Sequence, residues 1–353
     1  MKPLFEVKEV DRVFYESRLK SFLPSRMIDV HTHIWLADFM SGTRLNSRGP
    51  TWPARVARDN PADDLIASYG LLFPDQQVKA LLFGHPSRCC DLSRNNHYVA
   101  QCAKEHGMPA LMITVPDADV GDLERQLDNG GFIGAKVYLD LAPEQIPSEE
   151  ICIYDFLPKE QLTLFNERSA VVMLHIPRPA RLKDPLNLRQ MMEIEQEYPH
   201  IRLIIAHVGR AYCPEDIGNA FEVLSRSERM MFDFSANTNE QVFIELIKAV
   251  GPKRILFGSD LPITRMRMKR VCENGSYINI VPKDLYGDLT GESHMREAEG
   301  EDAESLTFFM YEEVDAFRRA VEKTGLSKED IADIFYRNAE RTLGLDGEWG
   351  GNV

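Results

Sequence analysis

Eight short apolar segments, separated by longer stretches, constrain the fold of this chain more than any other sequence feature. They are residues 27–30, 78–83, 110–115, 133–139, 170–174, 203–206, 230–234 and 255–257. Short apolar runs bounded by polar or turn residues are typical of strands buried on both faces of a parallel sheet. Their alternation with helical patterns predicts βαβ units, and a (β/α)8 barrel requires eight of these. We therefore predict an α/β protein with a TIM-like (β/α)8 barrel, long βα loops and extra terminal helices.

The stretches between the apolar segments show helical periodicity at residues 94–105, 121–128, 161–168, 187–197, 214–225 and 240–250. Residues 1–26 are expected to form an arm or helix outside the barrel, and residues 27–353 a single barrel domain. Two long stretches, near 35–75 and 261–305, would be βα loops on the active-site face, or the second would be partly a solvated segment. Two C-terminal helices are expected at 306–324 and 327–343.

Net charge and cysteine content restrict the partners that we expect. The formal net charge of −14 argues against a nucleic-acid partner, because phosphate binding needs clustered Lys and Arg. A small anionic substrate remains compatible with this charge, since arginines can cluster locally. The six cysteines show neither CxxC nor a disulfide-dense spacing, so we expect reduced thiols in a cytoplasmic protein. We expect no signal peptide and no membrane span, because no run approaches ~18 apolar residues.

The sharpest local motif is Asp29-Val30-His31-Thr32-His33, at the end of the first apolar segment. Residues i and i+2 of a strand point to the same side, so both imidazoles would project together. Imidazole is a preferred ligand of zinc and related divalent metals, and such a pair can supply half of a catalytic coordination shell. The alternative is one packed and one exposed histidine that share no function.

Three more residues suited to metal binding or proton transfer follow apolar segments directly. His175 ends AVVMLH, His207 ends LIIAH, and Asp260 follows ILFGS. A single histidine at such a position often has only a structural role. In a barrel, however, the carboxyl ends of all strands meet at one face, where active sites lie. The coincidence of these residues with the His31/His33 pair therefore predicts one shared site.

Five segments resemble the amidohydrolase superfamily, specifically the amidohydrolase-related branch that contains aminocarboxymuconate-semialdehyde decarboxylase. They are DVHTHIW at 29–35, GAKVYL at 134–139, VVMLH at 171–175, IRLIIAHVG at 201–209 and RILFGSDLP at 254–262. The resemblance implies a distorted (β/α)8 barrel and one divalent metal ion, usually zinc, with manganese as an alternative. It also implies the residue roles: His31, His33, His175 and Asp260 as metal ligands, and His207 as a catalytic acid/base or carbonyl-polarising group.

The residue types agree with these implied roles. A metal held by imidazoles and a carboxylate can lower the pKa of a coordinated water from about 15.7 towards about 7. Asp260 could accept a proton from that water, and His207, with an ordinary pKa near ~6.5, suits proton transfer near neutrality. In binuclear relatives, a lysine of the fourth strand is carboxylated and bridges two metals. For Lys136 we expect instead a pairing with a buried carboxylate or with the substrate.

Arginines after the predicted strands are candidates for binding an anionic substrate, because guanidinium matches carboxylate or phosphate in a two-point fashion. Arg210 is the strongest candidate, since it departs from the glycine pair common in the family after this histidine. Arg178 and Arg265 are further candidates, and Arg181 and Arg267 occupy similar positions. Three other residues could line the pocket: Trp35, Trp52 and His85.

These features predict a metal-dependent hydrolase that acts on an amide, lactone or related carbonyl of a small, carboxylated substrate. The alternative is a non-oxidative decarboxylase with the same site residues. A third interpretation, a catalytically silent barrel with a binding role, conflicts with the intact set of five site residues. Phosphate-loop, dinucleotide-binding and GxSxG motifs do not occur in the sequence. A homo-oligomer such as a dimer is expected from the resemblance.

Overall fold

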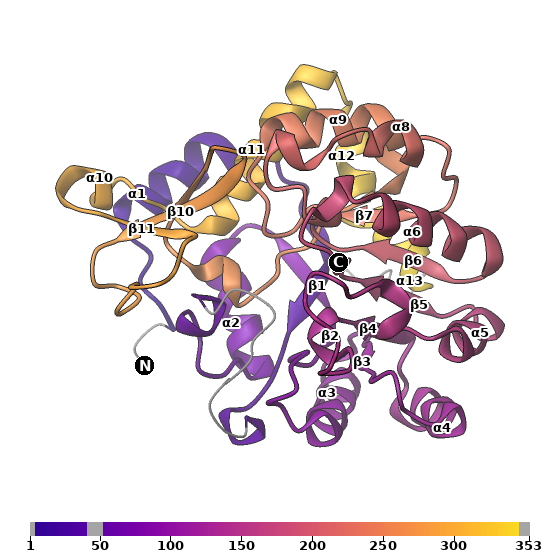
Figure 1. Cartoon of the computed structure of the whole chain (residues 1–353). Helices are drawn as coiled ribbons and strands as arrows, with labels where there is room; N and C mark the ends of the chain where they lie inside the picture. Colours follow the sequence, from indigo (N-terminus) through magenta and orange to yellow (C-terminus); the bar gives the residue numbers. More distant parts are fainter. Residues whose placement is uncertain (1–3, 41–51, 346–353) are drawn as a thin grey trace.

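Eight parallel strands form the centre of the protein within the part of the chain that the structure, a computed structural model, describes: residues 4–40 and 52–345 (Figure 1). They are β1 (Arg26–His33), β2 (Gln77–Phe83), β3 (Met112–Ile113), β4 (Gly134–Val137), β5 (Val171–Leu174), β6 (Arg202–Ile205), β7 (Met231–Asp233) and β8 (Ile255–Leu256). Each strand coincides with one predicted apolar segment. The fold is the predicted (β/α)8 barrel.

Backbone contacts at two places close the strands into a ring. β3 to β8 pair in sequence order as one sheet, and β1 pairs with β2. Leu82 forms a parallel bridge with Ala110, which joins β2 to the segment before β3. On the other side, Thr32 of β1 bridges Leu261 after β8, and the amide of Val30 donates to the carbonyl of Phe257 at 3.0 Å. Nearest-neighbour pairing in chain order is the expected topology of a barrel.

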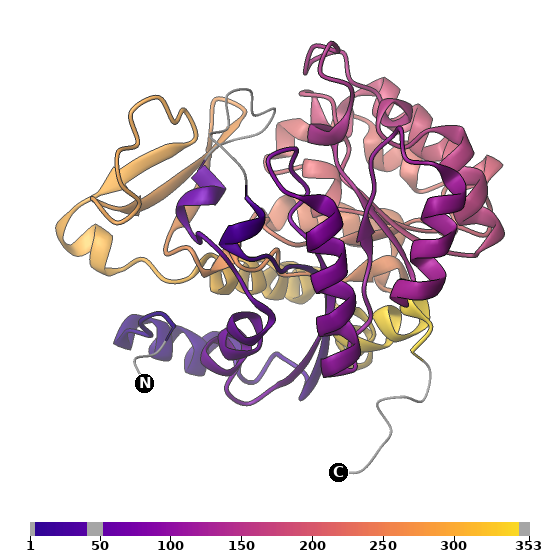
Figure 2. The same cartoon turned by 90° about the horizontal axis from the view of Figure 1, so that it is seen from below.

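Helices between the strands surround the barrel (Figures 1 and 2). They are α2 (Ala62–Leu72), α3 (Leu92–His106), α4 (Val120–Gly130), α5 (Lys159–Glu167), α6 (Pro185–Glu197), α8 (Ala220–Leu224) and α9 (Glu240–Val250). The side chains of Asp91, Asp119 and Asn239 accept from backbone amides in the first turns of α3, α4 and α9. One prediction was wrong in extent. Residues 214–225 form a 3-10 turn and the short helix α8, because Gly218 adopts φ +53° and interrupts the helix.

Two apolar cores separate the inside of the barrel from its outside. The inner core contains Ile28, Val30 and Leu81, while the neighbouring strand residues Ala80 and Leu82 pack outward with the helices. Leu343 of α13 (Asn338–Leu343) joins the inner core, and Figure 2 shows the yellow C-terminal helices against the strands. The amino ends of the strands are therefore plugged by apolar side chains. The open end of the barrel is at their carboxyl ends.

The two stretches predicted to be long loops contain regular structure. Residues 35–75 include α2, the first helix of the barrel, and part of this stretch lies outside the described residues. Residues 261–305 contain a three-stranded sheet of β9 (Lys269–Glu273), β10 (Ser276–Pro282) and β11 (Met295–Ala298), followed by α10 (Gly300–Glu304). In Figure 1 this insertion sheet lies beside the barrel in orange. Alternate residues of β10 are buried, so one face of the sheet is packed, whereas residues 283–305 are exposed or half-buried, as expected for a partly solvated segment.

The terminal segments pack on one another beside the barrel. They comprise α1 (Glu9–Phe14), a π-helical turn (Tyr15–Leu19), α11 (Phe309–Thr324), α12 (Lys328–Ala332) and a second π-helical turn (Asp333–Arg337) that leads into α13. Asp11 accepts two hydrogen bonds from Arg267, at 2.8 and 2.6 Å, and both side chains are buried. Arg267 therefore ties the N-terminal segment to the insertion. Among the described residues, no helix combines the length and apolar character needed to cross a membrane.

The expectation that all cysteines are reduced is wrong for two of them. Cys213, in the loop after β6, forms a disulfide with Cys272 of β9, while Cys89, Cys90, Cys102 and Cys152 are free. The two partners are 59 residues apart in the sequence, and only the packing of the insertion sheet against the barrel brings them together. Spacing alone could not reveal such a pair.

Candidate active site

A β-bulge in β1 directs His31 and His33 into the mouth of the barrel. The pairing of β1 with β2 proceeds residue by residue to Asp29 and resumes at Thr32 opposite Leu82, so two residues of β1 face Leu81 alone. Before the bulge, Met27 and Asp29 face away from the inner core that contains Ile28. Without the extra residue, strict alternation would send both histidines outward as well. Bulges of this kind re-aim side chains next to active sites.

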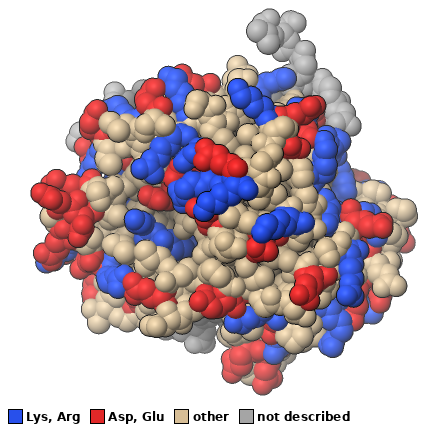
Figure 3. Space-filling view, turned by 90° about the horizontal axis from the view of Figure 1, so that it is seen from above, with Lys and Arg blue, Asp and Glu red and all other residues tan. Residues whose placement is uncertain are grey.

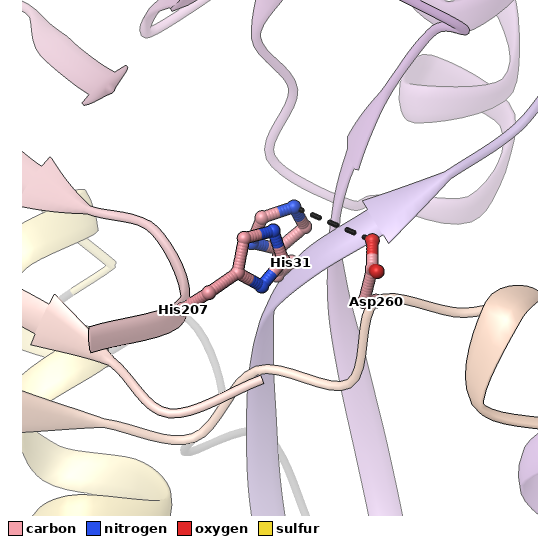
Figure 4. Close-up of side chains that lie close together, drawn as sticks. All are labelled: His31, His207 and Asp260. Carbon is pink, nitrogen blue, oxygen red and sulfur yellow. Dashed lines mark ion pairs between the residues drawn. The ribbon is translucent and has the colours of Figure 1, made fainter. Parts of the chain in front are cut away.

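Hydrogen bonds through Nδ1 hold both imidazoles in place. His31 Nδ1 donates to Asp233 Oδ2 at 2.9 Å, and both side chains are almost fully buried. His33 Nδ1 donates to the carbonyl oxygen of Gly84 at 2.9 Å. Both rings are thereby oriented with Nε2 towards Asp260 Oδ1, at 3.6 Å from His31 (Figure 4) and 3.3 Å from His33. Such outer partners fix the tautomer and direction of histidines that bind metals.

Asp260 is fixed by the backbone that joins β8 to β1. Its amide donates to the carbonyl of His31 at 2.7 Å, and its φ is +60°, an unusual value for a residue other than glycine. The close approach depends on Gly258, where an added Cβ would lie 2.9 Å from the Cβ of His31. The chain thus uses a strained residue and a glycine to place one carboxylate beside two imidazoles.

A left-handed turn places His207 and Arg210 at the end of β6. Four consecutive residues have positive φ: 56° at His207, 51° at Val208, 60° at Gly209 and 61° at Arg210. The turn is therefore not an ordinary α-helix, although it is labelled α7 (His207–Arg210). The left-handed region costs roughly 1–2 kcal/mol for each residue with a side chain, so the surrounding packing must hold it. Backbone strain of this kind clusters at functional sites.

The turn brings His207 against His31, with ring centroids 4.6 Å apart. His207 Nδ1 lies 3.0 Å from the carbonyl oxygen of Ser235. Potential ligand atoms of His31, His207 and Asp260 all lie within 4.8 Å of one another, as Figure 4 shows for their side chains. His207, predicted from the sequence as an acid/base group, is thus part of the tightest cluster of metal-ligand types among the described residues.

His175, predicted as a metal ligand, lies beside His207 and outside the cluster of His31, His207 and Asp260. It is buried beside Tyr138, with ring centroids 4.5 Å apart, and its ring centroid is 5.3 Å from that of His207. Its Nδ1 has no hydrogen-bond partner among the described residues. The structure therefore brings His31, His33, Asp260 and His207 together and leaves His175 at the edge of the group.

Burial keeps the imidazoles of His31, His175 and His207 neutral, and the carboxylate of Asp260 is ionised. Burial, with the neighbouring charge of Lys136, lowers the pKa of His31 to about 3. Burial also lowers the pKa values of His175 and His207. Burial alone would raise the pKa of Asp260, but the hydrogen bond to His33 and the adjacent imidazoles lower it to about 2. Neutral imidazoles and an ionised carboxylate are the protonation states that bind a divalent cation, so the residues present fit a metal ion.

Lys136 does not pair with a buried carboxylate among the described residues. Its Nζ lies 3.2 Å from Nε2 of His31 and 5.3 Å from the ring centroid of Phe83. Burial lowers the pKa of this amine to about 8. The lysine therefore lies beside the candidate metal ligands and inside the pocket, where it can contact a bound molecule.

A cavity of about 430 Å³ opens above these residues. Trp35, Trp52 and His85 line it, as predicted, and so does Arg210. Arg178 and Arg265 do not belong to the lining: Arg178 Nε donates to Asp184 at 3.0 Å, and the Arg265 guanidinium lies 5.8 Å from the ring centroid of Phe5. We therefore no longer assign these two arginines to the site.

Several residues of the site escaped the sequence-based prediction. Asp233 and Ser235 lie at the carboxyl end of the seventh apolar segment, in MMFDFS, just as His207 lies at the end of the sixth. The rule that strand carboxyl ends meet at one face therefore also predicts these two residues. Arg58 and Arg270 add two guanidinium groups to the cavity lining, beside Arg181, which was already a candidate from its position after the fifth apolar segment. Arg270 comes from the insertion sheet, for which the sequence carried no signal of proximity. Elsewhere, on the face shown in Figure 3, basic and acidic side chains are interspersed without a continuous basic band.

Solved structures of similar fold are enzymes that act on small organic acids. A 2,6-dihydroxybenzoate decarboxylase in complex with 2,6-dihydroxybenzoate has a TM-score of 0.54 and 16% identity, with 92% of this chain and 100% of that chain covered. A probable 2-pyrone-4,6-dicarboxylic acid hydrolase from Acinetobacter baumannii, with citric acid bound, has a TM-score of 0.56 and 16% identity, with 90% and 99% covered. A dihydroxybenzoic acid decarboxylase from Polaromonas, with manganese and 2-nitroresorcinol bound, has a TM-score of 0.55 and 14% identity, with 94% and 100% covered.

No curated protein matches the chain at a significant level. The profile of the Amidohydrolase family matches residues 28–345, which span nearly all of the barrel and its C-terminal helices. The resemblance inferred from the five motifs is thereby confirmed. The chain belongs to the Amidohydrolase family and is an enzyme of the amidohydrolase superfamily.

Proposed function

We propose that this enzyme is a metal-dependent hydrolase that adds water to an amide, lactone or related carbonyl of a small anionic substrate. The observation that carries the proposal is the hydrogen bond between His207 Nδ1 and the carbonyl oxygen of Ser235, at 3.0 Å. A carbonyl oxygen only accepts, and Ser235 Oγ, 2.9 Å from the same nitrogen, donates its own proton to Asp233 Oδ1, so both contacts favour the tautomer with the proton on Nδ1 and a free lone pair on Nε2. A neutral histidine with this tautomer is ready to accept a proton, as hydrolysis requires, and has none to give to carbon from Nε2.

His31, His33 and Asp260 are the residues that would hold the metal, with His175 completing the set. A divalent ion bound there would polarise the substrate carbonyl and lower the pKa of water. Zinc is our first choice because the site is rich in imidazole, which suits zinc well. Manganese is the second choice, and it is bound in the dihydroxybenzoic acid decarboxylase of similar fold.

The other residues of the site act on protons and on charge. Asp260 and His207 lie side by side and can each accept a proton from the attacking water. Asp233 accepts from His31 Nδ1 and from the amide of His207, at 2.9 Å each, and so orients both histidines. Arg210 lines the cavity beside His207 and forms no ion pair within the described residues, which supports a role in binding a substrate carboxylate.

Decarboxylation is the second candidate, because two of the three solved structures described above are decarboxylases. Both reactions would use the same residues and differ in the role of water. Hydrolysis transfers an oxygen atom from water to the product. Decarboxylation releases CO2 and replaces the lost carboxylate with a proton from the site or solvent.

Isotope labelling of the reaction separates the two candidates. The zinc- and manganese-loaded proteins are incubated with carboxylated lactones and amides, and with aromatic and muconate-type acids, in H2¹⁸O and in D2O. A hydrolase incorporates one ¹⁸O into the new carboxyl group and releases no CO2. Release of CO2 with deuterium on the product carbon would overturn the proposal. His207→Gln serves as the control, because it keeps a polar side chain but loses the base.

A further inference from the structure

The insertion sheet contributes its own cationic group to the pocket. Arg270 of β9, Tyr277 of β10 and His294, just before β11, all line the cavity together with the metal-ligand candidates. Tyr212, from the loop after β6, faces Tyr277 edge-on with ring centroids 5.1 Å apart. The wall opposite the strand ends is thus built partly by residues outside the barrel.

Arg270 is held rigidly between aromatic rings. Its guanidinium carbon lies 4.5 Å from the ring centroids of Tyr277 and Phe309, and 5.0 Å from that of Tyr212. Nε donates to Asn279 Oδ1 at 2.8 Å, and Nη1 donates to the carbonyl of Ala236. Rings and hydrogen bonds together restrict the rotamers of a side chain that is otherwise flexible, so the conformational cost of binding a ligand is low.

Arg270 has no ion-pair partner within the described part of the chain, and the buried carboxyl group of Glu313 acts on its charge only from beyond ion-pair distance. Its hydrogen-bond partners Asn279 and Ala236 are uncharged, and no carboxylate forms an ion pair with it. Arg181, which approaches the same two tyrosines, differs because Asp216 pairs with it at 2.7 Å. A partly buried, unpaired guanidinium in a pocket is costly unless an anion completes it. Nη2 of Arg270 has no hydrogen-bond partner among the described residues.

A disulfide links the insertion sheet, which carries Arg270 and Tyr277, to the loop that carries Tyr212. Cys272 lies two residues after Arg270 on β9, and Cys213 follows Tyr212 directly. Their disulfide connects the insertion sheet to the loop that leaves His207 and Arg210. The position of Arg270 relative to the catalytic end of the pocket is therefore built into the fold.

We propose that Arg270, framed by Tyr212 and Tyr277, is a second anion-binding subsite that selects substrates with two separated carboxylates. One carboxylate or carbonyl end lies at the metal-ligand candidates with Arg210, and the far carboxylate binds Arg270. The cavity of about 430 Å³ is within the range that holds a small ring compound with two acidic groups. The inference rests on the proposed function only in placing the reacting end at His207 and Asp260.

Binding of two inert acids tests this subsite without turnover. Isophthalate carries two carboxylates on one ring and benzoate carries one. Their dissociation constants for the zinc-loaded protein are measured by calorimetry. Wild type should bind isophthalate roughly 10- to 100-fold more tightly than benzoate, the factor expected for one charge-assisted hydrogen-bonded contact. Arg270→Gln should remove that preference and leave the affinity for benzoate within about 2-fold, since an additive contact is lost.

Two further variants make the result specific. Arg296→Gln is the matched control, because Arg296 lies on β11 of the same sheet, is exposed and pairs with Glu273 at 2.6 Å outside the pocket lining. It should keep the preference for isophthalate. Arg270→Lys keeps the charge but loses the planar fork, so a reduced preference is expected. If Arg270→Gln does not fold, as judged by its melting curve, an undiminished preference in Arg270→Lys overturns the proposal.

The outcomes also separate this inference from the proposed function. Equal binding of both acids by wild type, or an equal loss of both in Arg270→Gln, overturns the subsite even if labelled water enters the product. A preference for isophthalate that depends on Arg270 supports the subsite even if the labelled reaction releases CO2. In that case only the hydrolase proposal fails.

Discussion

Replacement of Gly209 by alanine probes the left-handed turn that carries His207 and Arg210. Gly209 has φ +60°, and a Cβ added there would lie 2.4 Å from Cδ1 of Leu182 and 3.4 Å from Cδ1 of Ile176. Two costs therefore add. A left-handed alanine costs roughly 1–2 kcal/mol, and overpacking of a filled core costs roughly 1–3 kcal/mol. We expect Gly209→Ala to lower the free energy of unfolding by about 2–5 kcal/mol.

Gly107 provides a matched control for the first of these costs. It ends α3 with the same φ of +60°, and no heavy atom lies within 4 Å of an added Cβ. Gly107→Ala should therefore lower the free energy of unfolding by only about 1–2 kcal/mol. The difference between the two variants measures the steric cost of the contacts with Leu182 and Ile176.

Urea unfolding followed by circular dichroism gives both free energies, and turnover is measured on the same samples. Gly209→Ala should also reduce turnover, because relief of the contact with Leu182 must move the turn that bears His207. Gly107→Ala should retain full turnover, since α3 ends just before β3, at the amino ends of the strands and opposite the site residues. Equal destabilisation by the two substitutions would refute the steric argument. Full activity of Gly209→Ala would refute the claim that the turn positions His207.

Three more substitutions test the site and its surroundings. Asp233→Asn should weaken zinc affinity by roughly 10- to 100-fold in a chelator competition, because His31 loses the charged acceptor that orients it. His207→Ala should abolish turnover while the bound zinc, measured by elemental analysis, is retained. Burial raises the pKa of Glu313 well above its ordinary value, so the neutral form is favoured in the folded protein. The stability that this group contributes is complete below its unfolded pKa of ~4.3 and is lost as pH rises through the raised folded pKa. Glu313→Gln should therefore gain melting temperature relative to wild type as the pH rises above about 5.

For each of these three predictions, one result would contradict the reasoning. Unchanged zinc affinity in Asp233→Asn would mean that the His31 contact is not needed for metal binding. Loss of zinc in His207→Ala would make His207 a ligand instead of a base. A melting-temperature difference between Glu313→Gln and wild type that stays constant with pH would mean that Glu313 titrates normally, despite its buried contact with the amide of Ala236.

Local sequence patterns determined the barrel and the location of its site. Strand and helix periodicities arise from side-chain directions along a few consecutive residues, so they can be recognised in the sequence. The same holds for the i, i+2 relation of His31 and His33. The rule that strand carboxyl ends converge then placed His207 and Asp260 beside them, and it would have added Asp233 had it been applied to the seventh segment.

Tertiary structure alone decided how these residues face one another and what else joins them. The bulge that turns His31 inward depends on the pairing of β1 with β2. The close contact of His207 with His31 depends on a strained left-handed turn, which leaves no periodic pattern in the sequence. Arg270 and the Cys213–Cys272 disulfide belong to contacts between segments distant in the chain. Strand register, left-handed turns and long-range packing are set by the whole fold, because each depends on partners that the neighbouring residues do not specify.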